Sequence, residues 1–150
     1  MDVKRHDSIR GEFAYQLHQQ MEKDPNIWLV MGDLGYAMFD FCRRDFPDRC
    51  INVGAAEQAM LGVAVGLSEA GKRVFTYTIT SFYLRAAETI GLYLHNEGIP
   101  VQLVGSGRDG DYSHDGPSHH GGLAQAFLGS LNLEQYYPSS KEEISDMVTK

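Results

Sequence analysis

The sequence predicts an α/β fold of three layers, in which helices cover both faces of a mostly parallel sheet. Short apolar runs rich in β-branched and aromatic residues alternate with longer segments of helical periodicity. The strand-like runs are almost continuously apolar, as in strands that are buried on both faces. Strands that are separated by helices pair in parallel, because each helix carries the chain back to the end of the sheet at which the previous strand began.

Length and composition limit the classes of protein to which the chain can belong. Its 150 residues suit one domain, and we expect residues 1–150 to form it. The net charge of −7 argues against nucleic acid or an anionic membrane as the main partner. No apolar run reaches the roughly 20 residues of a membrane span, and the N-terminus does not resemble a signal peptide. With only two cysteines, Cys42 and Cys50, a protein of the reducing cytoplasm is expected.

The first half of the chain contains three predicted helices and two predicted strands. We expect a helix over residues 7–23, a strand over 26–32, a short helix over 37–46, a strand over 49–53 and a helix over 56–71. The first helix has an Asp or Ser cap and an apolar stripe of 3.6-residue period from Ile9 to Met21. The second stops before Pro47. The third ends at Gly71 and is apolar enough to be packed on nearly all sides.

The second half repeats the alternation around one long loop. We expect a strand over residues 73–79, a helix over 81–98, a strand over 99–106, a loop over 105–122, a helix over 123–131, a short strand over 133–138 and a helix over 140–150. The loop is long for a connection in an α/β fold, and ordered loops of this length are often functional.

Glu57 stands out because it interrupts a stretch that is otherwise apolar or small. In a parallel sheet, ligands bind at the carboxyl ends of the strands, and Glu57 follows such an end in the first turn of a helix. The helix dipole favours a carboxylate there, and a polar ligand would make its burial tolerable. Glu57 is either a capping residue or part of a site. The small residues Gly54, Ala55 and Ala59 allow close approach of a ligand or tight packing of the helix.

The long loop carries a cluster of titratable side chains in the sequence SHDGPSHHGG. His114, Asp115, His119 and His120 lie within seven residues. Three interpretations remain open at this point: a metal site, a solvated polar loop, and a substrate-binding loop whose His and Asp contact hydroxyls and transfer protons. The metal interpretation has the least support, because the loop lacks Cys and the usual helical spacing of His ligands.

Three stretches in this order resemble a known family. They are FPDRCINVGAAEQAMLGVAVGLSEAGKRVF, SFYLRAAETI and DGPSHHG. Together they are similar to the pyrimidine-binding domain of transketolases and 1-deoxyxylulose-5-phosphate synthases, and the resemblance runs from about Ser8 to the end of the chain. It implies the thiamine diphosphate-binding fold.

The resemblance implies a role for the residues that bind the cofactor. Glu57 corresponds to the acid that contacts N1′ of the aminopyrimidine of thiamine diphosphate and shifts the ring to its imino tautomer. Phe82 corresponds to the aromatic residue that stacks on the pyrimidine, with Tyr83 as the alternative if the register differs by one. Asp33, in the turn GDLG, corresponds to an acidic residue close to the cofactor, or is a turn Asp.

The resemblance also implies residues that contact the substrate. Asp115 and His119 correspond to a pair that binds substrate hydroxyls and assists proton transfer. Arg85 either binds a substrate phosphate, as in the synthases, or forms an ion pair with Glu88 on the helix surface. Arg108 lies near the position of another phosphate-binding arginine, although the loop differs in length.

The segment that binds the diphosphate through Mg²⁺ in this family is absent from the sequence. Its mark is G-D-G followed further on by Asn, and GRDGDY does not match it. The resemblance therefore implies one subunit of a split transketolase, which transfers a two-carbon ketol unit between sugars or sugar phosphates. A partner chain would hold the diphosphate and Mg²⁺, in a heterotetramer that also brings copies of this chain together.

Three other functions remain open. The first is a subunit of a synthase-like or acyloin-type carboligase that uses a keto acid such as pyruvate. The second is a degenerate pyrimidine domain that only binds a partner. The third is a metalloprotein built on the histidine loop.

Overall fold

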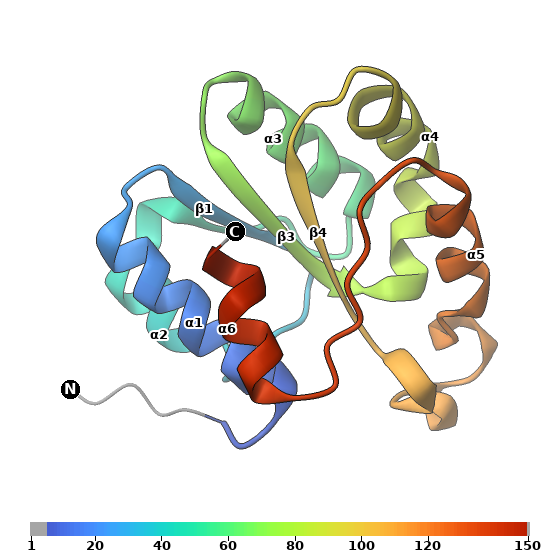
Figure 1. Cartoon of the computed structure of the whole chain (residues 1–150), viewed down its shortest axis with the longest axis horizontal. Coiled ribbons are helices and arrows are strands. Elements are labelled where there is room, and N and C mark those ends of the chain that lie inside the picture. Colours follow the sequence, from blue (N-terminus) through green and yellow to red (C-terminus); the bar gives the residue numbers. More distant parts are fainter. Residues whose placement is uncertain (1–5, 150) are drawn as a thin grey trace.

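A computed structural model describes residues 6–149, apart from the side chain of Asp109, and contains a four-stranded parallel sheet (Figure 1). The strands are β1 (Ile27–Met31), β2 (Cys50–Asn52), β3 (Arg73–Ile79) and β4 (Val101–Ser106), in the spatial order β2-β1-β3-β4. All three pairings are parallel, with Leu29 opposite Phe75 and Cys50 on its two sides. The predicted α/β class and the four predicted strands before the long loop are confirmed.

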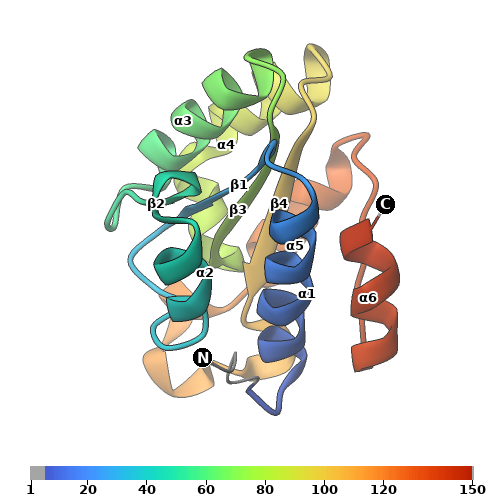
Figure 2. The same cartoon turned by 90° about the vertical axis from the view of Figure 1, so that its left-hand side faces the viewer.

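The helices form two layers, one on each face of the sheet (Figure 2). One layer contains α1 (Ile9–Lys23), α2 (Asp40–Asp45) and α6 (Lys141–Thr149), and the other contains α3 (Glu57–Glu69), α4 (Ala87–Thr89) and α5 (Gly122–Ser130). Each layer has its own cluster of buried apolar side chains, such as Leu17 and Phe39 in the first and Met60 and Ile90 in the second. Burial on both faces explains the apolar sequences of the central strands β1 and β3, whereas the edge strands β2 and β4 are only partly buried.

Helix α1 begins where its sequence predicts. Ser8 is the N-cap, and its hydroxyl accepts a hydrogen bond from the backbone N–H of Gly11 at 2.9 Å. The stripe that includes Phe13, Leu17 and Met21 is buried against the sheet.

No helix among residues 6–149 is long and apolar enough to cross a membrane.

Helix α3 is exposed on one face, so the prediction that it is packed on nearly all sides is wrong. Its buried residues are Glu57, Met60, Leu61, Ala64 and Ser68. The opposite face is exposed and consists mainly of small residues, namely Ala59, Gly62, Val63 and Gly66. Small residues raise the mean hydropathy of a helix without requiring burial, and the sheet and α4 cover only one side of α3. We call Ala59, Gly62, Val63 and Gly66 the small-residue face.

The helix predicted over residues 81–98 is not a regular α-helix. It begins as a 3₁₀ segment, η2 (Thr80–Ala86), continues through the single turn of α4, and ends as a π-helical segment, η3 (Ile90–Asn96). In a 3₁₀ helix, side chains three residues apart lie on the same side. This geometry places the Arg85 side chain beside Phe82. In a regular α-helix the two side chains would be aligned less closely along the axis.

The strand predicted over residues 133–138 is wrong, because this segment is coil. Tyr136 and Tyr137 are exposed, and their hydroxyls hydrogen-bond to Glu134 and Gln135, each two residues earlier in the chain. Pro138 has no backbone N–H to donate to a neighbouring strand.

A pH-dependent contact joins α1 to α2. The buried His18 lies 2.9 Å from a carboxylate oxygen of Asp45, and Arg44 donates to the other oxygen at 2.6 Å. The Arg44 guanidinium and then the His18 imidazole hold the pKa of Asp45 well below its usual range. A lowered pKa adds stability that is present above the unfolded-state pKa of about 3.9 and is lost as the pH falls through the folded-state value.

Asp45→Asn is therefore expected to lower the thermal unfolding midpoint near neutral pH, and the difference from the wild type should shrink below about pH 4. Circular dichroism at several pH values measures both midpoints. Asp48→Asn, at an exposed neighbouring position, is the control and should change little. A difference for Asp45→Asn that stays constant down to acidic pH would contradict this assignment.

Candidate functional site

Glu57 is the buried carboxylate at the carboxyl edge of the sheet. It is the first residue of α3 and is 2% exposed. Its Oε2 accepts a hydrogen bond from Nη1 of Arg85 at 2.8 Å, and the Thr78 hydroxyl lies 3.5 Å from Oε1. Gly32 lies beside this pair: a Cβ there would be tight against the Thr78 hydroxyl at 3.2 Å and in ordinary contact with Oε1 of Glu57 at 3.7 Å. The carboxylate therefore faces other elements rather than its own helix end.

Arg85 connects Glu57 to the ring of Phe82. Its guanidinium carbon lies 3.9 Å from the Phe82 ring centroid, close enough for a cation–π contact. The Arg85 side chain is 50% exposed, so its ion pair with the buried Glu57 spans the boundary between core and solvent. The sequence left open an ion pair between Arg85 and Glu88, but the structure pairs Arg85 with Glu57 instead.

Tyr83, the alternative stacking residue, lies in the core. It is 1% exposed, and its hydroxyl hydrogen-bonds with the Thr76 hydroxyl at 2.9 Å and donates to the Val104 carbonyl at 3.1 Å. Burial raises its pKa. Phe82, by contrast, is only partly buried and is the aromatic ring that meets Arg85.

His119 is the member of the histidine loop that reaches Phe82. The two ring centroids are 5.0 Å apart with an edge-on geometry. Three short 3₁₀ turns form this loop, η4 (Arg108–Gly110), η5 (Ser113–Asp115) and η6 (Pro117–His119). The Ser81 hydroxyl donates to the Ser118 carbonyl at 2.8 Å and fixes η6 to η2. The loop thus brings His119 to the cluster formed by Glu57, Phe82 and Arg85.

The other sequence-predicted residues lie around this cluster. Asp115 is exposed and pairs with His114 at 3.2 Å, and His120 is exposed. Asp33 is exposed in the turn after β1, and Arg108 is partly buried at the start of η4. The contacts described above from Glu57 through Arg85 and Phe82 to His119 do not include Asp115, His120 or Asp33.

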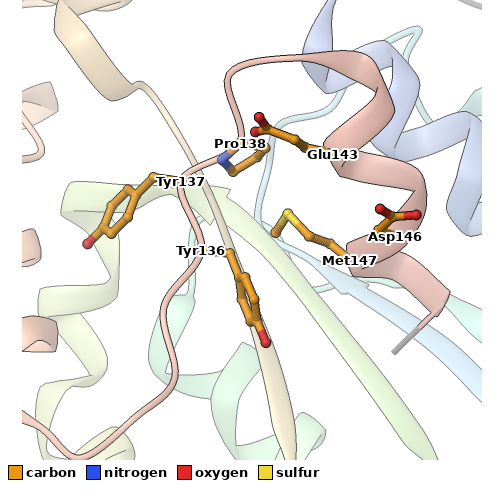
Figure 3. Close-up of a pocket in the computed structure, with 6 residues that line it drawn as sticks. All are labelled: Tyr136, Tyr137, Pro138, Glu143, Asp146 and Met147. Atoms are coloured by element: carbon orange, nitrogen blue, oxygen red, sulfur yellow. The ribbon is translucent and has the colours of Figure 1, made fainter.

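Two hollows of about 290 Å³ each lie on the surface. One adjoins His119 and is lined by Gly107, Gly110, Ser113, His119, His120, Gly121 and Gly122. The other lies between the 136–138 coil and α6 and is lined by Tyr136, Tyr137, Pro138, Glu143, Asp146 and Met147 (Figure 3). The second hollow shares no residue with the cluster around Glu57, so only the first can belong to the same site.

Metal ligands are not clustered in the part of the chain that the structure describes. Within residues 6–149, no group of three His, Cys, Asp or Glu side chains is placed to hold a metal ion. His114 and Asp115 form a pair and are joined by no third ligand of these types in that range. The arrangement at Glu57 instead offers one buried carboxylate, one aromatic face and one imidazole.

Sequence analysis missed two contributors to this site. Thr78 lies in a strand that reads as a buried apolar run, and its hydroxyl faces Glu57. The Glu57–Arg85 pair joins residues 28 positions apart. The signal for Thr78 in the sequence was a threonine within an apolar strand. The Glu57–Arg85 pair instead depends on the 3₁₀ geometry of η2.

Comparisons with known proteins show the family to which the chain belongs. The family model described as "Transketolase, pyrimidine binding domain" matches residues 8–150. An "Uncharacterized 33.6 kDa protein in fasciation locus" of Rhodococcoides fascians is 30% identical over 95% of this chain and 46% of its own length. A 1-deoxy-D-xylulose-5-phosphate synthase of Syntrophomonas wolfei is 29% identical over 97% of this chain and 23% of its own length.

A solved structure is also similar to this chain. A protein described as "Split gene transketolase, inactive beta4 tetramer" has a TM-score of 0.80 and 28% identity, over 94% of this chain and 46% of that chain. This chain thus spans less than half the length of each of these proteins. The match to the family model covers nearly the whole sequence, and the chain belongs to the transketolase pyrimidine-binding domain family.

Proposed function

We propose that this chain is the pyrimidine-binding subunit of a split, thiamine diphosphate-dependent transketolase that transfers a two-carbon ketol unit between sugars or sugar phosphates. The observation that carries the proposal is the buried Glu57 carboxylate beside the Phe82 ring, at the carboxyl edge of a sheet that belongs to this family. The likeness to a split-gene transketolase supports the division into two chains.

The residues around Glu57 fit the pyrimidine ring of the cofactor. The Glu57 carboxylate is buried, so a hydrogen bond to a ring nitrogen is strengthened by the low local dielectric. Phe82 offers a ring face, which Arg85 covers in this structure. The cofactor, when bound, supplies the carbanion chemistry. Glu57 would hold and polarise the pyrimidine and Phe82 would offer the ring against which it lies, with Tyr83 supporting the same segment from the core.

Arg85 competes with the pyrimidine for the same two groups. Its guanidinium uses the Glu57 carboxylate and the Phe82 ring, which are the groups assigned to the pyrimidine. Binding of the ring therefore requires Arg85 to move, and its 50% exposure leaves solvent on one side. Once displaced, Arg85 is available for an anionic group of the substrate.

The histidine loop provides the substrate side of the proposed site. His119 adjoins both Phe82 and the glycine-lined hollow. An imidazole nitrogen can donate or accept a proton at substrate oxygens. Asp115 and Arg108, which lie in the same loop, are assigned to hydroxyl and phosphate groups, and Asp33 to the cofactor side.

The cofactor also needs a diphosphate and Mg²⁺ site, which we assign to a partner chain. Among residues 6–149 no cluster of ligands for a metal is present. The small-residue face of α3 starts at Ala59, two residues after Glu57, and exposed apolar side chains such as Tyr36 and Leu123 lie on the loop after β1 and at the start of α5. These surfaces support contact with other chains in a cytoplasmic heterotetramer. Self-association is supported by the neighbour described as a β4 tetramer.

A second candidate function is a synthase-like carboligase that uses a keto acid as donor. The synthases of Syntrophomonas wolfei and Aquifex aeolicus are 29% and 30% identical to this chain. Phe82 and Arg85 lie in the segment that resembles the synthases. The two functions differ in the donor, so an assay with a ketose phosphate and with pyruvate separates them.

The test is a gentle purification of the tagged chain from its own host with Mg²⁺ and thiamine diphosphate present. We expect a second polypeptide with a G-D-G…N segment, bound cofactor, and ketol transfer from a ketose donor. Consumption of pyruvate alone would replace the transketolase assignment with the carboligase. A chain that emerges alone and without cofactor would favour a non-catalytic binding module and contradict the proposal.

The small-residue face of α3 gives a direct test of the partner contact. Val63→Glu places a charge on this face, and we expect the association to weaken at least about tenfold, because an interface core tolerates an unpaired charge poorly. Light scattering after size exclusion measures the assembly. Glu69→Gln, at the exposed end of the same helix, is the control. Assembly that is equally strong in both variants would place the interface elsewhere.

A further inference from the structure

Arg10 connects α1 to the histidine loop. It lies in the first turn of α1, and its Nη1 donates a hydrogen bond to the Tyr112 hydroxyl at 2.6 Å across a sequence separation of 102 residues. The guanidinium carbon is 5.7 Å from the Tyr112 ring centroid. The contact is charge-assisted, and such bonds are shorter and stronger than neutral ones.

The Tyr112 ring packs against the backbone at the end of β4. Gly107 has a φ of +91°, and a Cβ at this position would lie 2.6 Å from Cδ2 of Tyr112. The absence of a side chain therefore allows the ring to lie against the backbone where the loop begins. The Ser106 hydroxyl lies 3.4 Å from the Tyr112 hydroxyl. Loop residue Tyr112 is thus fixed to α1 by Arg10 and to the sheet by Ser106 and Gly107.

Burial raises the pKa of Tyr77, a residue of β3 that is 2% exposed, and the nearby Ser106 and Arg10 side chains act in the opposite direction. The contacts of Tyr112 with Arg10, Ser106 and Gly107 join α1, β4 and the loop.

Tyr112 in turn contacts His119. Their ring centroids are 6.1 Å apart at an interplanar angle of 55°, and His119 meets Phe82 on another side at 5.0 Å. The Ser118 hydroxyl lies 3.0 Å from Nδ1 of His119. Arg10, Tyr112, His119 and Phe82 thus form a continuous row of contacts from α1 to the proposed pyrimidine site.

We infer that Arg10 and Tyr112 are positioning residues, which brace the histidine loop and so set the imidazole of His119 against Phe82. The catalytic consequence of this brace rests on the proposed function of His119, whereas the brace itself does not. Removing either side of the Arg10–Tyr112 bond should release the loop while α1 and the sheet keep their structure, because the bond is at the surface.

The first test measures the position of His119 without any enzymatic assay. In the full chain, NMR records the ring resonances of His119, and hydrogen exchange records the amides of residues 107–122. Tyr112→Phe and Arg10→Met should move the His119 resonances toward those of a free imidazole and speed the loop exchange about tenfold. Arg10→Lys keeps the cation and should restore part of the wild-type signal.

Two controls separate the brace from general destabilisation. Tyr137→Phe removes a hydroxyl that bonds to Gln135, and Arg44→Met removes a surface arginine that pairs with Asp45. Both should leave the His119 resonances unchanged, and exchange of the β3 amides reports the global fold. Unchanged His119 resonances in Tyr112→Phe and Arg10→Met, with β3 intact, would overturn the inference.

The assembled enzyme gives the second readout. Tyr112→Phe should lower kcat several-fold and leave the cofactor Kd unchanged, since the hydroxyl is assigned to the loop and not to the cofactor. A complex without activity toward any donor would remove the proposed function, while the NMR result would still decide on the brace. Lowered activity with unmoved His119 resonances would leave the function standing and reject the positioning role.

Discussion

Glu57→Gln is expected to lower kcat of the assembled enzyme by about 10²- to 10⁴-fold, the range for loss of a proton-transferring or charge-stabilising group. The amide keeps the shape of the side chain but cannot take the place of the carboxylate at a pyrimidine nitrogen. The buried position of Glu57 makes the loss of kcat larger, because little water reaches the site to replace the lost hydrogen bond.

The measurement is a steady-state assay of the reconstituted complex, together with cofactor binding followed by circular dichroism. Glu69→Gln makes the same chemical change at an exposed position of the same helix and should keep the wild-type rate. The variant should still assemble, which separates a catalytic loss from a folding loss. Full activity of Glu57→Gln would remove the central residue of the proposed function.

Arg85→Met is expected to destabilise the cofactor-free chain by about 1–3 kcal/mol, since it leaves a buried carboxylate with only a long contact to Thr78. The value lies below the about 3–5 kcal/mol of a fully buried ion pair, because Arg85 is half exposed and water can replace part of its contact. Urea unfolding of the isolated chain measures the change in free energy.

A double-variant cycle gives the control for Arg85. Glu57→Gln removes the charge that Arg85 neutralises, so Arg85→Met should have a much smaller effect on stability in that background. Glu88→Gln alters the other carboxylate considered for Arg85 and should change little. An equal effect of Arg85→Met in both backgrounds would show that the Glu57–Arg85 pair does not contribute to folding stability.

The sequence predicted the sheet and the location of the site for physical reasons that are local. Strands such as β1 and β3 are buried on both faces, so their composition alone marks them. Helix α1 is fixed by the Ser8 cap and its apolar stripe. Because parallel strands bring their carboxyl ends to one edge, the segment that holds Glu57 and the histidine loop could be assigned to that edge before any coordinates.

The errors came from patterns that composition does not resolve. Because of the small-residue face, the sequence of α3 predicted burial on nearly all sides, although small side chains are compatible with exposure. The 133–138 segment contains β-favouring tyrosines, but they hydrogen-bond locally and remain in a coil. Helix geometry over residues 81–98 also depends on packing against the sheet rather than on propensity.

The sequence by itself determined the α/β class, the buried strands and the presence of one carboxylate in an apolar segment, because hydrophobic pattern and capping act over a few residues. Only the tertiary structure decided which side chains meet: Arg85 with Glu57, His119 with Phe82, and Arg10 with Tyr112. These pairs depend on the 3₁₀ turn of η2 and on the path of the long loop. Such contacts are set by packing across the whole molecule, which no local pattern encodes.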